Sequence, residues 1–335
     1  MLHVDSASED RGGQTQLALL IEGMEALGHR ALLAAPPRGA LASRLGRPVL
    51  PLHAGHGLRA AWQLRTHLEA SCPDLVAAHT PHAHGLCLAA GCLPVVHRRV
   101  DFAVGRSALG RWKLARARLY VAVSGAVARV LARGGVPEGR IRVVHDGVRA
   151  LPPAAPAPDL CGPGPLVGCI GALVAHKGHR HFLDALARLP GLRGAIAGEG
   201  PLRPALERQI AALGLGGRVR LLGQRRDPAA VLAALDLLVH PSVEEGFGQV
   251  VVEALLAGRP VVVTDAGGLP ELVGPLSAPV PAGDPESLAA AIRARLAEPG
   301  PPGPGLARAR ERFSVEAMVA GTLAAYEEAL ASARG

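Results

Sequence analysis

The stretch EGFGQVVVEALLAGRPVVV (residues 245–263) decides the fold of this chain. It reads as a glycine-rich loop, an apolar helix, a glycine stop, a proline and a β-branched strand. We predict the helix over residues 249–257, with Gly258 as its left-handed C-terminal cap and Pro260 just beyond. A buried strand that ends at His240 precedes the loop. This order is the repeating unit of a parallel α/β sheet.

Two carboxylates flank the start of the predicted helix. Glu245 lies before the helix, and Glu253 lies about five residues into it, or about 7 Å along its axis at roughly 1.5 Å per residue. Gly246 and Gly248 allow a ligand close to the backbone, and the free N–H groups of a helix start suit a phosphate. The helix is apolar around most of its circumference, so a carboxylate on it needs a partner. We interpret the stretch as a diphosphate site, with a sugar near Glu245 and ribose hydroxyls near Glu253. A surface glutamate and a solvated helical one are the simpler alternative.

The stretch resembles the Glu-x7-Glu motif of the retaining, nucleotide-sugar-dependent glycosyltransferases of family 4. That resemblance implies the GT-B fold: an α/β protein with two Rossmann-like doubly wound parallel-sheet domains and an interdomain cleft. It also implies that Glu245 positions the donor sugar, that Glu253 binds the ribose and that Gly246, Phe247 and Gly248 line the donor site. The same-face attack of this family needs no covalent carboxylate nucleophile.

Length and periodicity agree with two domains. The chain has 335 residues, of which 49% are hydrophobic, enough for two cores. Strand-like and helix-like segments alternate, and a segment rich in proline and glycine interrupts them. We therefore expect an acceptor-side domain over residues 1–150, a linker over 151–165 and a nucleotide-sugar-binding domain over 166–312. By resemblance, a C-terminal helix within 313–335 packs back on the first domain.

Two features of the first half add candidate site residues. Gly12 and Gly13 follow the first strand and open a helix, and the resemblance implies that this loop faces the donor phosphates. His97 ends a strand over residues 94–97, where ligands bind in open α/β sheets, and its imidazole can donate to or polarise a hydroxyl. The resemblance places a histidine near the reacting sugar, and His97 is our match. His79 is the rival position.

The second half carries one cationic match and one mismatch. The family pattern has an arginine directly after a strand glycine and a Lys-Gly pair a few residues later, and both cations hold the leaving diphosphate. Lys177 matches the lysine, which makes Glu245, Lys177 and His97 the predicted catalytic residues. Ala172 stands where the arginine belongs. Three nearby residues remain open as replacements: His176, His179 and Arg180.

Further loops of the second half resemble parts of the nucleotide pocket. Gly198, Glu199 and Gly200 match the Gly-x-Gly loop that the family places near the base, although they also read as a turn before a proline-started helix. The segment 223–225 ends the next strand and is expected to line the same pocket.

Composition limits the other partners. The net charge is +8, but aromatic residues make up only 2% and no nucleic-acid module is visible, so we expect no nucleic acid. Five cysteines lack zinc-ligand spacing, and no apolar run reaches about 18 residues. The chain opens straight into a strand without a secretory leader, so we expect a cytoplasmic protein. A basic segment with Trp112, over residues 106–118, suggests peripheral contact with an anionic membrane; a solvated basic helix is the alternative.

These observations define the expected reaction. The donor is a UDP-, GDP- or ADP-sugar, the acceptor is a cell-envelope or lipid-linked glycan, and no cofactor or metal is expected, since the family needs none and no Asp-x-Asp motif is visible. Two alternatives remain: a sugar-nucleotide epimerase on the same fold, and a degenerate protein that binds the donor without turnover.

Overall fold

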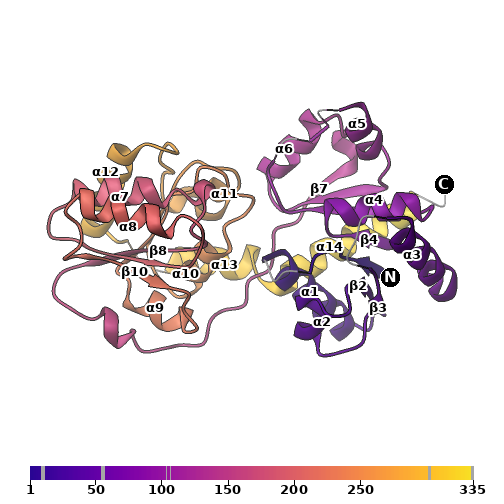
Figure 1. The fold of residues 1–335 in the computed structure, drawn as a ribbon, viewed down its shortest axis with the longest axis horizontal. Helices are drawn as coiled ribbons and strands as arrows, with labels where there is room; N and C mark the ends of the chain where they lie inside the picture. Colours follow the sequence, from indigo (N-terminus) through magenta and orange to yellow (C-terminus); the bar gives the residue numbers. More distant parts are fainter. Residues whose placement is uncertain (9–11, 54–56, 103, 106, 301–302, 333–335) are drawn as a thin grey trace. The chain divides into compact units, whose positions relative to one another are not determined.

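The computed structural model describes residues 1–335 except 9–11, 54–56, 103, 106, 301–302 and 333–335 (Figure 1). The chain divides into two compact units. The first contains Met1–Gly147 together with Ser314–Gly335, and the second contains Val148–Phe313. Within the described part of the chain, no helix combines the length and the apolarity that crossing a bilayer requires.

The first unit is built on a parallel sheet. Its described strands follow the order β3-β2-β1-β4-β5-β6-β7, so the direction of winding reverses between β1 and β4. Such a reversal opens a crevice at the carboxyl ends of the two central strands. The strands are mostly buried aliphatic runs: β1 (Leu2–Val4), β2 (Leu32–Ala35), β3 (Leu50–Pro51), β4 (Val76–Ala78), β5 (Val95–Arg98), β6 (Leu119–Ala122) and β7 (Ile141–Val143).

Helices connect these strands, and several begin at a hydroxyl cap. Thr80 Oγ1 accepts a hydrogen bond from the amide of Ala83 at 3.0 Å, which fixes the helix start directly after β4. The helices of the first unit are α1 (Gly12–Ala26), α2 (Ala40–Leu45), α3 (Leu58–Ser71), α4 (Pro81–Ala89), α5 (Ala108–Leu114), α6 (Gly125–Arg133) and α14 (Val315–Ala331).

The C-terminal helix α14 belongs to the first unit. It packs on α1 at a point where only a glycine fits, because a Cβ on Gly23 would lie 2.5 Å from Val319 Cγ2. The buried Met318, Val319 and Tyr326 of α14 join a core that includes the strand residues Val95 and Val121. The last helix of the chain is therefore part of the first core.

The second unit repeats the same architecture on a smaller sheet. Its described strands follow the order β10-β9-β8-β11-β12, all parallel, with the reversal between β8 and β11. The strands are β8 (Leu166–Ile170), β9 (Arg193–Ala197), β10 (Val219–Gly223), β11 (Leu237–His240) and β12 (Val261–Val263). The predicted α/β class with two doubly wound parallel sheets is confirmed.

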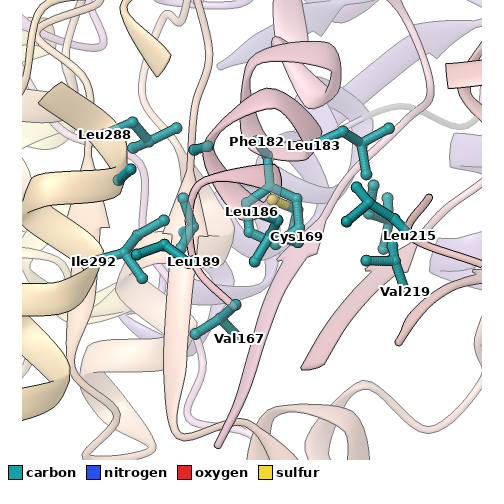
Figure 2. Packing of buried hydrophobic residues seen from close by; sticks show 14 of the residues in the cluster. Val167, Cys169, Phe182, Leu183, Leu186, Leu189, Leu215, Val219, Leu288 and Ile292 are labelled. Carbon is teal, nitrogen blue, oxygen red and sulfur yellow. The ribbon is translucent and has the colours of Figure 1, made fainter. Parts of the chain in front are cut away.

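The core of the second unit lies between its sheet and the helices that cover it. Figure 2 shows Val167 and Cys169 of β8 near Phe182 and Leu186 of α7, with Ile292 of α12 close by. The helices are α7 (His179–Ala187), α8 (Arg203–Ala212), α9 (Pro228–Ala234), α10 (Gln249–Leu256), α11 (Leu269–Val273), α12 (Pro285–Ala297) and α13 (Gly303–Arg312).

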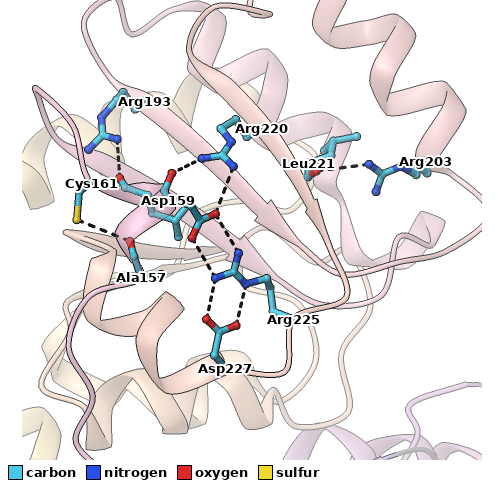
Figure 3. Close-up of polar contacts among 10 residues, drawn as sticks. Ala157, Asp159, Cys161, Arg193, Arg203, Arg220, Leu221, Arg225 and Asp227 are labelled. Atoms are coloured by element: carbon cyan, nitrogen blue, oxygen red, sulfur yellow. Dashed lines mark hydrogen bonds and ion pairs between the residues drawn. The ribbon is translucent and has the colours of Figure 1, made fainter.

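Part of the segment predicted as a linker, 151–165, is fixed to the second unit. Arg225 binds the Asp159 carboxylate through both terminal nitrogens, at 3.0 and 3.1 Å, and also pairs with Asp227 (Figure 3). The Arg193 guanidinium donates to the carbonyl of Leu160, which is buried. Arg225, which belongs to the segment expected to line the nucleotide pocket, is thus bound to two carboxylates.

Candidate active site

In the second unit, Glu245 lies in the loop that follows β11, and three donors converge on one of its oxygens. Lys177 Nζ donates to Glu245 Oε2 at 2.5 Å, His240 Nε2 at 2.8 Å and Ser242 Oγ at 3.3 Å. Because the carboxylate can only accept, the proton of the neutral His240 ring must be on Nε2. Two predicted catalytic residues, Lys177 and Glu245, are therefore in direct contact.

The close approach of two loops produces this contact. Lys177 ends a short 3-10 turn, Ala175–Lys177, and Gly178 follows with φ of 66°. A Cβ on Gly178 would lie 1.9 Å from the carbonyl oxygen of Pro241, so no other residue fits there. Since β8 and β11 are neighbours at the reversal point of the sheet, the loops after them meet at its carboxyl edge.

Electrostatics keep Glu245 ionised although its side chain is only 13% exposed. Burial alone would raise its pKa. The hydrogen bond from His240, the charge that this ring gains when it is protonated at low pH, and the charge and hydrogen bond of Lys177 oppose this effect and lower the pKa of Glu245 to about 2. Burial lowers the pKa of His240 itself, so this ring is a neutral donor at pH 7. The result is a carboxylate with a fixed charge and orientation.

Glu253 lies on α10, where Gln249 Nε2 donates to its Oε1 at 3.2 Å. Burial raises the pKa of Glu253, and the bond from Gln249 opposes the shift. The carboxylate is half-buried on a helix whose Val251, Val252 and Leu255 side chains are buried. A carboxylate on this apolar helix was expected to need a partner, and Gln249 is that partner.

The loop between the two glutamates is tightly packed. Gly248 precedes α10 with φ of 100°, and a Cβ there would lie 2.6 Å from Leu269 Cδ2. Gly246 is buried. The Phe247 ring is also buried and meets the ring of Phe313 edge-on, with centroids 5.7 Å apart. The Phe247 side chain therefore packs within the second unit, and the backbone of this loop is the part suited to a ligand.

The two glycines in the loop after β9 are also required by close contacts with a neighbouring backbone. A Cβ on Gly198 would lie 1.9 Å from the carbonyl oxygen of Gly171, and one on Gly200 would lie 2.6 Å from that of Leu173. Between them, Glu199 pairs with Arg203 at 2.8 Å. These glycines allow the loops after β8 and β9 to pack against each other at the carboxyl edge of the sheet.

The first unit has a cavity of about 600 Å³ at the corresponding edge of its own sheet, here called the β1–β4 cavity. Gly12 and Gly13, the first residues of α1, line it together with His79, His97 and Arg99. The residues before Gly12, at 9–11, lie outside the described part of the chain. Three residues predicted from the sequence, Gly12, Gly13 and His97, thus border one cavity.

His97 is part of a buried polar cluster. A hydrogen bond of 2.7 Å joins His97 Nε2 to the hydroxyl of Tyr326 on α14, and the His97 ring stacks on His79 with centroids 4.3 Å apart. His79 in turn shares a 2.9 Å hydrogen bond with His3. Burial lowers the pKa of His97 well below its ordinary value, and the charge of Arg99 adds to the effect. His97 is therefore neutral at pH 7.

Comparisons with known proteins agree with this arrangement. Residues 11–150 match the family model described as Glycosyltransferase Family 4, and residues 164–298 match the one described as Glycosyl transferases group 1. The chain is 33% identical over 251 residues to a 2-deoxystreptamine glucosyltransferase of Streptomyces kanamyceticus, covering 68% of this chain and 65% of that enzyme. It is 36% identical over 153 residues to the lipopolysaccharide core glycosyltransferase LpsE of Rhizobium meliloti, covering 42% and 45%.

A solved structure extends the likeness to the whole fold. HepE of Anabaena, crystallised with UDP, superposes with a TM-score of 0.82 at 23% identity, covering 98% of this chain and 99% of that one. The chain has the GT-B fold, and two glycosyltransferase family models match it over residues 11–150 and 164–298. The alignments span less than two thirds of the length of the two curated relatives.

The chain departs from the family 4 pattern at Ala172, and the structure leaves fewer residues that could replace the missing arginine. His179 is buried, with its Nε2 3.1 Å from the carbonyl oxygen of Ala172. Burial lowers the pKa of His179 to about 4, so it carries no charge at pH 7. His176 and Arg180 remain as possible replacements for the missing arginine.

Two contacts around the candidate site residues were not predicted from the sequence. His240 was seen only as the end of a strand, although the argument that selected His97, a histidine at the carboxyl end of a parallel strand, applies to it equally. Tyr326 had no local signal, because it reaches His97 from 229 positions along the chain.

Proposed function

We propose that this chain is a retaining glycosyltransferase that moves a sugar from a nucleoside-diphosphate sugar to a glycan. One observation carries the proposal: Glu245 is ionised and held by Lys177 and His240 at the reversal point of the second sheet. A carboxylate beside an ammonium suits a ligand that presents hydroxyls next to phosphates. A sugar diphosphate has both groups.

Lys177 is suited to the leaving group. Its ammonium has three N–H donors, so it can bind Glu245 and a phosphate oxygen at the same time. Negative charge grows on the diphosphate as the glycosidic bond breaks, and a fixed cation stabilises it. The N–H groups at the start of α10, after Gly248, supply further donors.

The carboxylates are suited to the two ends of the donor. An ionised carboxylate only accepts hydrogen bonds, so Glu245 is assigned to a hydroxyl of the donor sugar. Glu253, one helix turn from Gln249, is assigned to the ribose. Gly198, Glu199 and Gly200 are assigned to the side of the base.

The first unit is assigned to the acceptor. Of the residues that line its β1–β4 cavity, Gly12 and Gly13 are assigned to the donor phosphates and His97 to the reacting sugar. A cell-envelope or lipid-linked glycan is the proposed acceptor, and the LpsE relative, named for lipopolysaccharide core synthesis, supports this class. We further propose a cytoplasmic enzyme that needs no metal and touches an anionic membrane through α5, where Leu109 and Trp112 are exposed. Arg106, in the predicted basic segment, lies outside the described residues.

The first test uses donor binding. UDP-, GDP- and ADP-sugars are screened by thermal shift, because a ligand that binds only the folded state raises the melting temperature. Glu245→Gln and Lys177→Ala should lose the shift given by the sugar nucleotide. The matched control is Glu244→Gln, which removes an exposed carboxylate from the neighbouring position. Equal shifts in all three variants would contradict the assignment.

The second test uses the product. Donor and a panel of glycan acceptors are incubated with and without EDTA, and NMR of the product reports its anomeric configuration. Retention in the presence of EDTA is expected. Inversion would contradict the retaining mechanism, an epimer formed from donor alone would indicate the epimerase, and binding without turnover would indicate a degenerate protein.

A further inference from the structure

The first unit contains a second, smaller cavity beside the β1–β4 cavity. It measures about 170 Å³ and lies between β5, α4, α5 and α6; we call it the α5 cavity. Its walls are mainly the apolar side chains of Val96, Val104, Leu114 and Leu131. Three residues border both cavities: Pro81, His97 and Arg98.

Two uncharged polar side chains in the wall of the α5 cavity, Tyr120 and His84, donate to the protein's own backbone, and the third, His97, bonds the Tyr326 hydroxyl. The Tyr120 hydroxyl donates to the carbonyl of Leu114 at 2.9 Å. His84 Nε2 donates to the carbonyl of Arg116, also at 2.9 Å. A cavity whose polar groups are satisfied in this way favours an apolar occupant over water.

Two half-buried cations lie where the cavities adjoin. Lys113 Nζ donates to the carbonyl of Pro81 at 2.5 Å, and Arg98 donates to the carbonyls of Val100 and Phe102 at 2.9 and 2.8 Å. Burial lowers the pKa of Lys113, and the nearby charge of Arg98 lowers it further. Burial also lowers the pKa of Arg98, and the nearby charge of Asp101 opposes this shift. Like charges in a partly buried place repel each other, and an anion between them would relieve the repulsion.

We propose that the α5 cavity binds the hydrocarbon end of an anionic amphiphile, with the anionic group between Arg98 and Lys113. This inference rests on the proposed function, because it makes the amphiphile the acceptor and places its polar end in the β1–β4 cavity beside His97. The apolar α5 cavity, the two cations and the polar β1–β4 cavity thus follow one another in that order. A phosphate-linked lipid carrying a glycan has its parts in the same order.

The test measures the binding of soluble alkyl phosphates to the full chain. The chain has two tryptophans, Trp62 on α3 and Trp112 on α5, so Trp62→Phe leaves a single fluorescent reporter next to the cavity. The probes are inorganic phosphate, butyl, hexyl and octyl phosphate, and uncharged octyl glucoside. Affinity should rise roughly fourfold per added methylene until the cavity is full. Inorganic phosphate alone and octyl glucoside should each bind at least tenfold more weakly than octyl phosphate.

Two variants and one control separate the contribution of the apolar cavity from that of the positive charge. Val104→Phe fills the α5 cavity and should weaken octyl phosphate at least tenfold without affecting inorganic phosphate. Lys113→Gln keeps a donor for the carbonyl of Pro81 but removes the charge, so octyl phosphate should bind only about as well as octyl glucoside. Leu58→Phe, the control, adds a similar ring at an exposed position of α3, and its binding should not change. Near-ultraviolet circular dichroism checks that each variant is folded.

The outcomes separate this inference from the proposed function. If octyl phosphate binds no better than inorganic phosphate, or binds the Val104→Phe variant as well as the parent, the α5 cavity is not a hydrocarbon site. A thermal shift by sugar nucleotides in the same preparation would leave the glycosyltransferase proposal standing in that case. Chain-length-dependent binding without any response to sugar nucleotides would support the cavity and contradict the proposed acceptor role.

Discussion

The contact between Lys177 and Glu245 predicts a large, non-additive effect of substitution. The two side chains are 20% and 13% exposed, and their polar atoms are 2.5 Å apart. Lys177→Met leaves a largely buried carboxylate with only neutral donors. Removing one partner of a buried ion pair lowers the unfolding free energy by about 3–5 kcal/mol. Because this pair keeps some contact with solvent, we expect a loss of about 3 kcal/mol.

The double variant Lys177→Met/Glu245→Gln should recover much of that loss. No unpaired charge remains in it, and His240 can still donate to the amide oxygen of the new glutamine. We expect a coupling energy of about 2 kcal/mol in the double-mutant cycle. The double variant should nevertheless be inactive, since neither the ammonium for the diphosphate nor the carboxylate for the sugar is left.

The assay follows urea unfolding by two signals. Both tryptophans, Trp62 and Trp112, belong to the first unit, so the urea midpoint of the fluorescence transition should not change. Circular dichroism reports both units, so it should show the lower urea midpoint of the second unit. Burial lowers the pKa of His240, and the charge of Lys177 lowers it further. In Lys177→Met the ring can therefore take up a proton more easily, so the loss of unfolding free energy should become smaller as the pH falls below about 6.5. Strictly additive costs would refute the coupling, and an active double variant would refute the catalytic assignment.

Three further predictions follow from the described contacts. Burial lowers the pKa of His3 from 6.5 to about 3, so its contribution to the unfolding free energy is complete above pH 6.5 and is lost as the pH falls. The unfolding free energy measured in urea should therefore be at least about 1.3 kcal/mol lower at pH 5.5 than at pH 7.5. Gly178→Ala should lower the unfolding free energy by more than about 1 kcal/mol, because its Cβ would collide with the Pro241 carbonyl at a positive φ; a melting temperature equal to the parent's would contradict this. Tyr326→Phe removes the hydroxyl that holds the His97 ring and should lower kcat more than it changes the KM of the donor, which steady-state kinetics can measure.

The local sequence was sufficient for the repeating architecture. Apolar runs separated by glycine and proline located most strands, because a strand buried on both faces needs a short apolar run and a turn after it. No strand was predicted from the local sequence at β3 (Leu50–Pro51), a two-residue strand at the edge of the sheet. Such elements form through packing against neighbours, which local periodicity does not report.

For the candidate site, the sequence by itself determined which residue types were available. The glycines at 246 and 248, the glutamates at 245 and 253 and the lysine at 177 were all recognisable from spacing and from a family pattern. The structure added an explanation for the glycines: a Cβ on Gly178 would collide with the Pro241 carbonyl, and one on Gly248 would collide with the Leu269 side chain of α11.

Only the tertiary structure decided which side chains meet. Lys177 and Glu245 are 68 positions apart, and they touch because β8 and β11 pair as neighbours at the point where the sheet reverses. His97 meets Tyr326 because the last helix packs into the first core. Local propensity and periodicity specify elements, whereas burial and the order of strands in a sheet determine the distances between side chains, and the pKa of Glu245 depends on those distances.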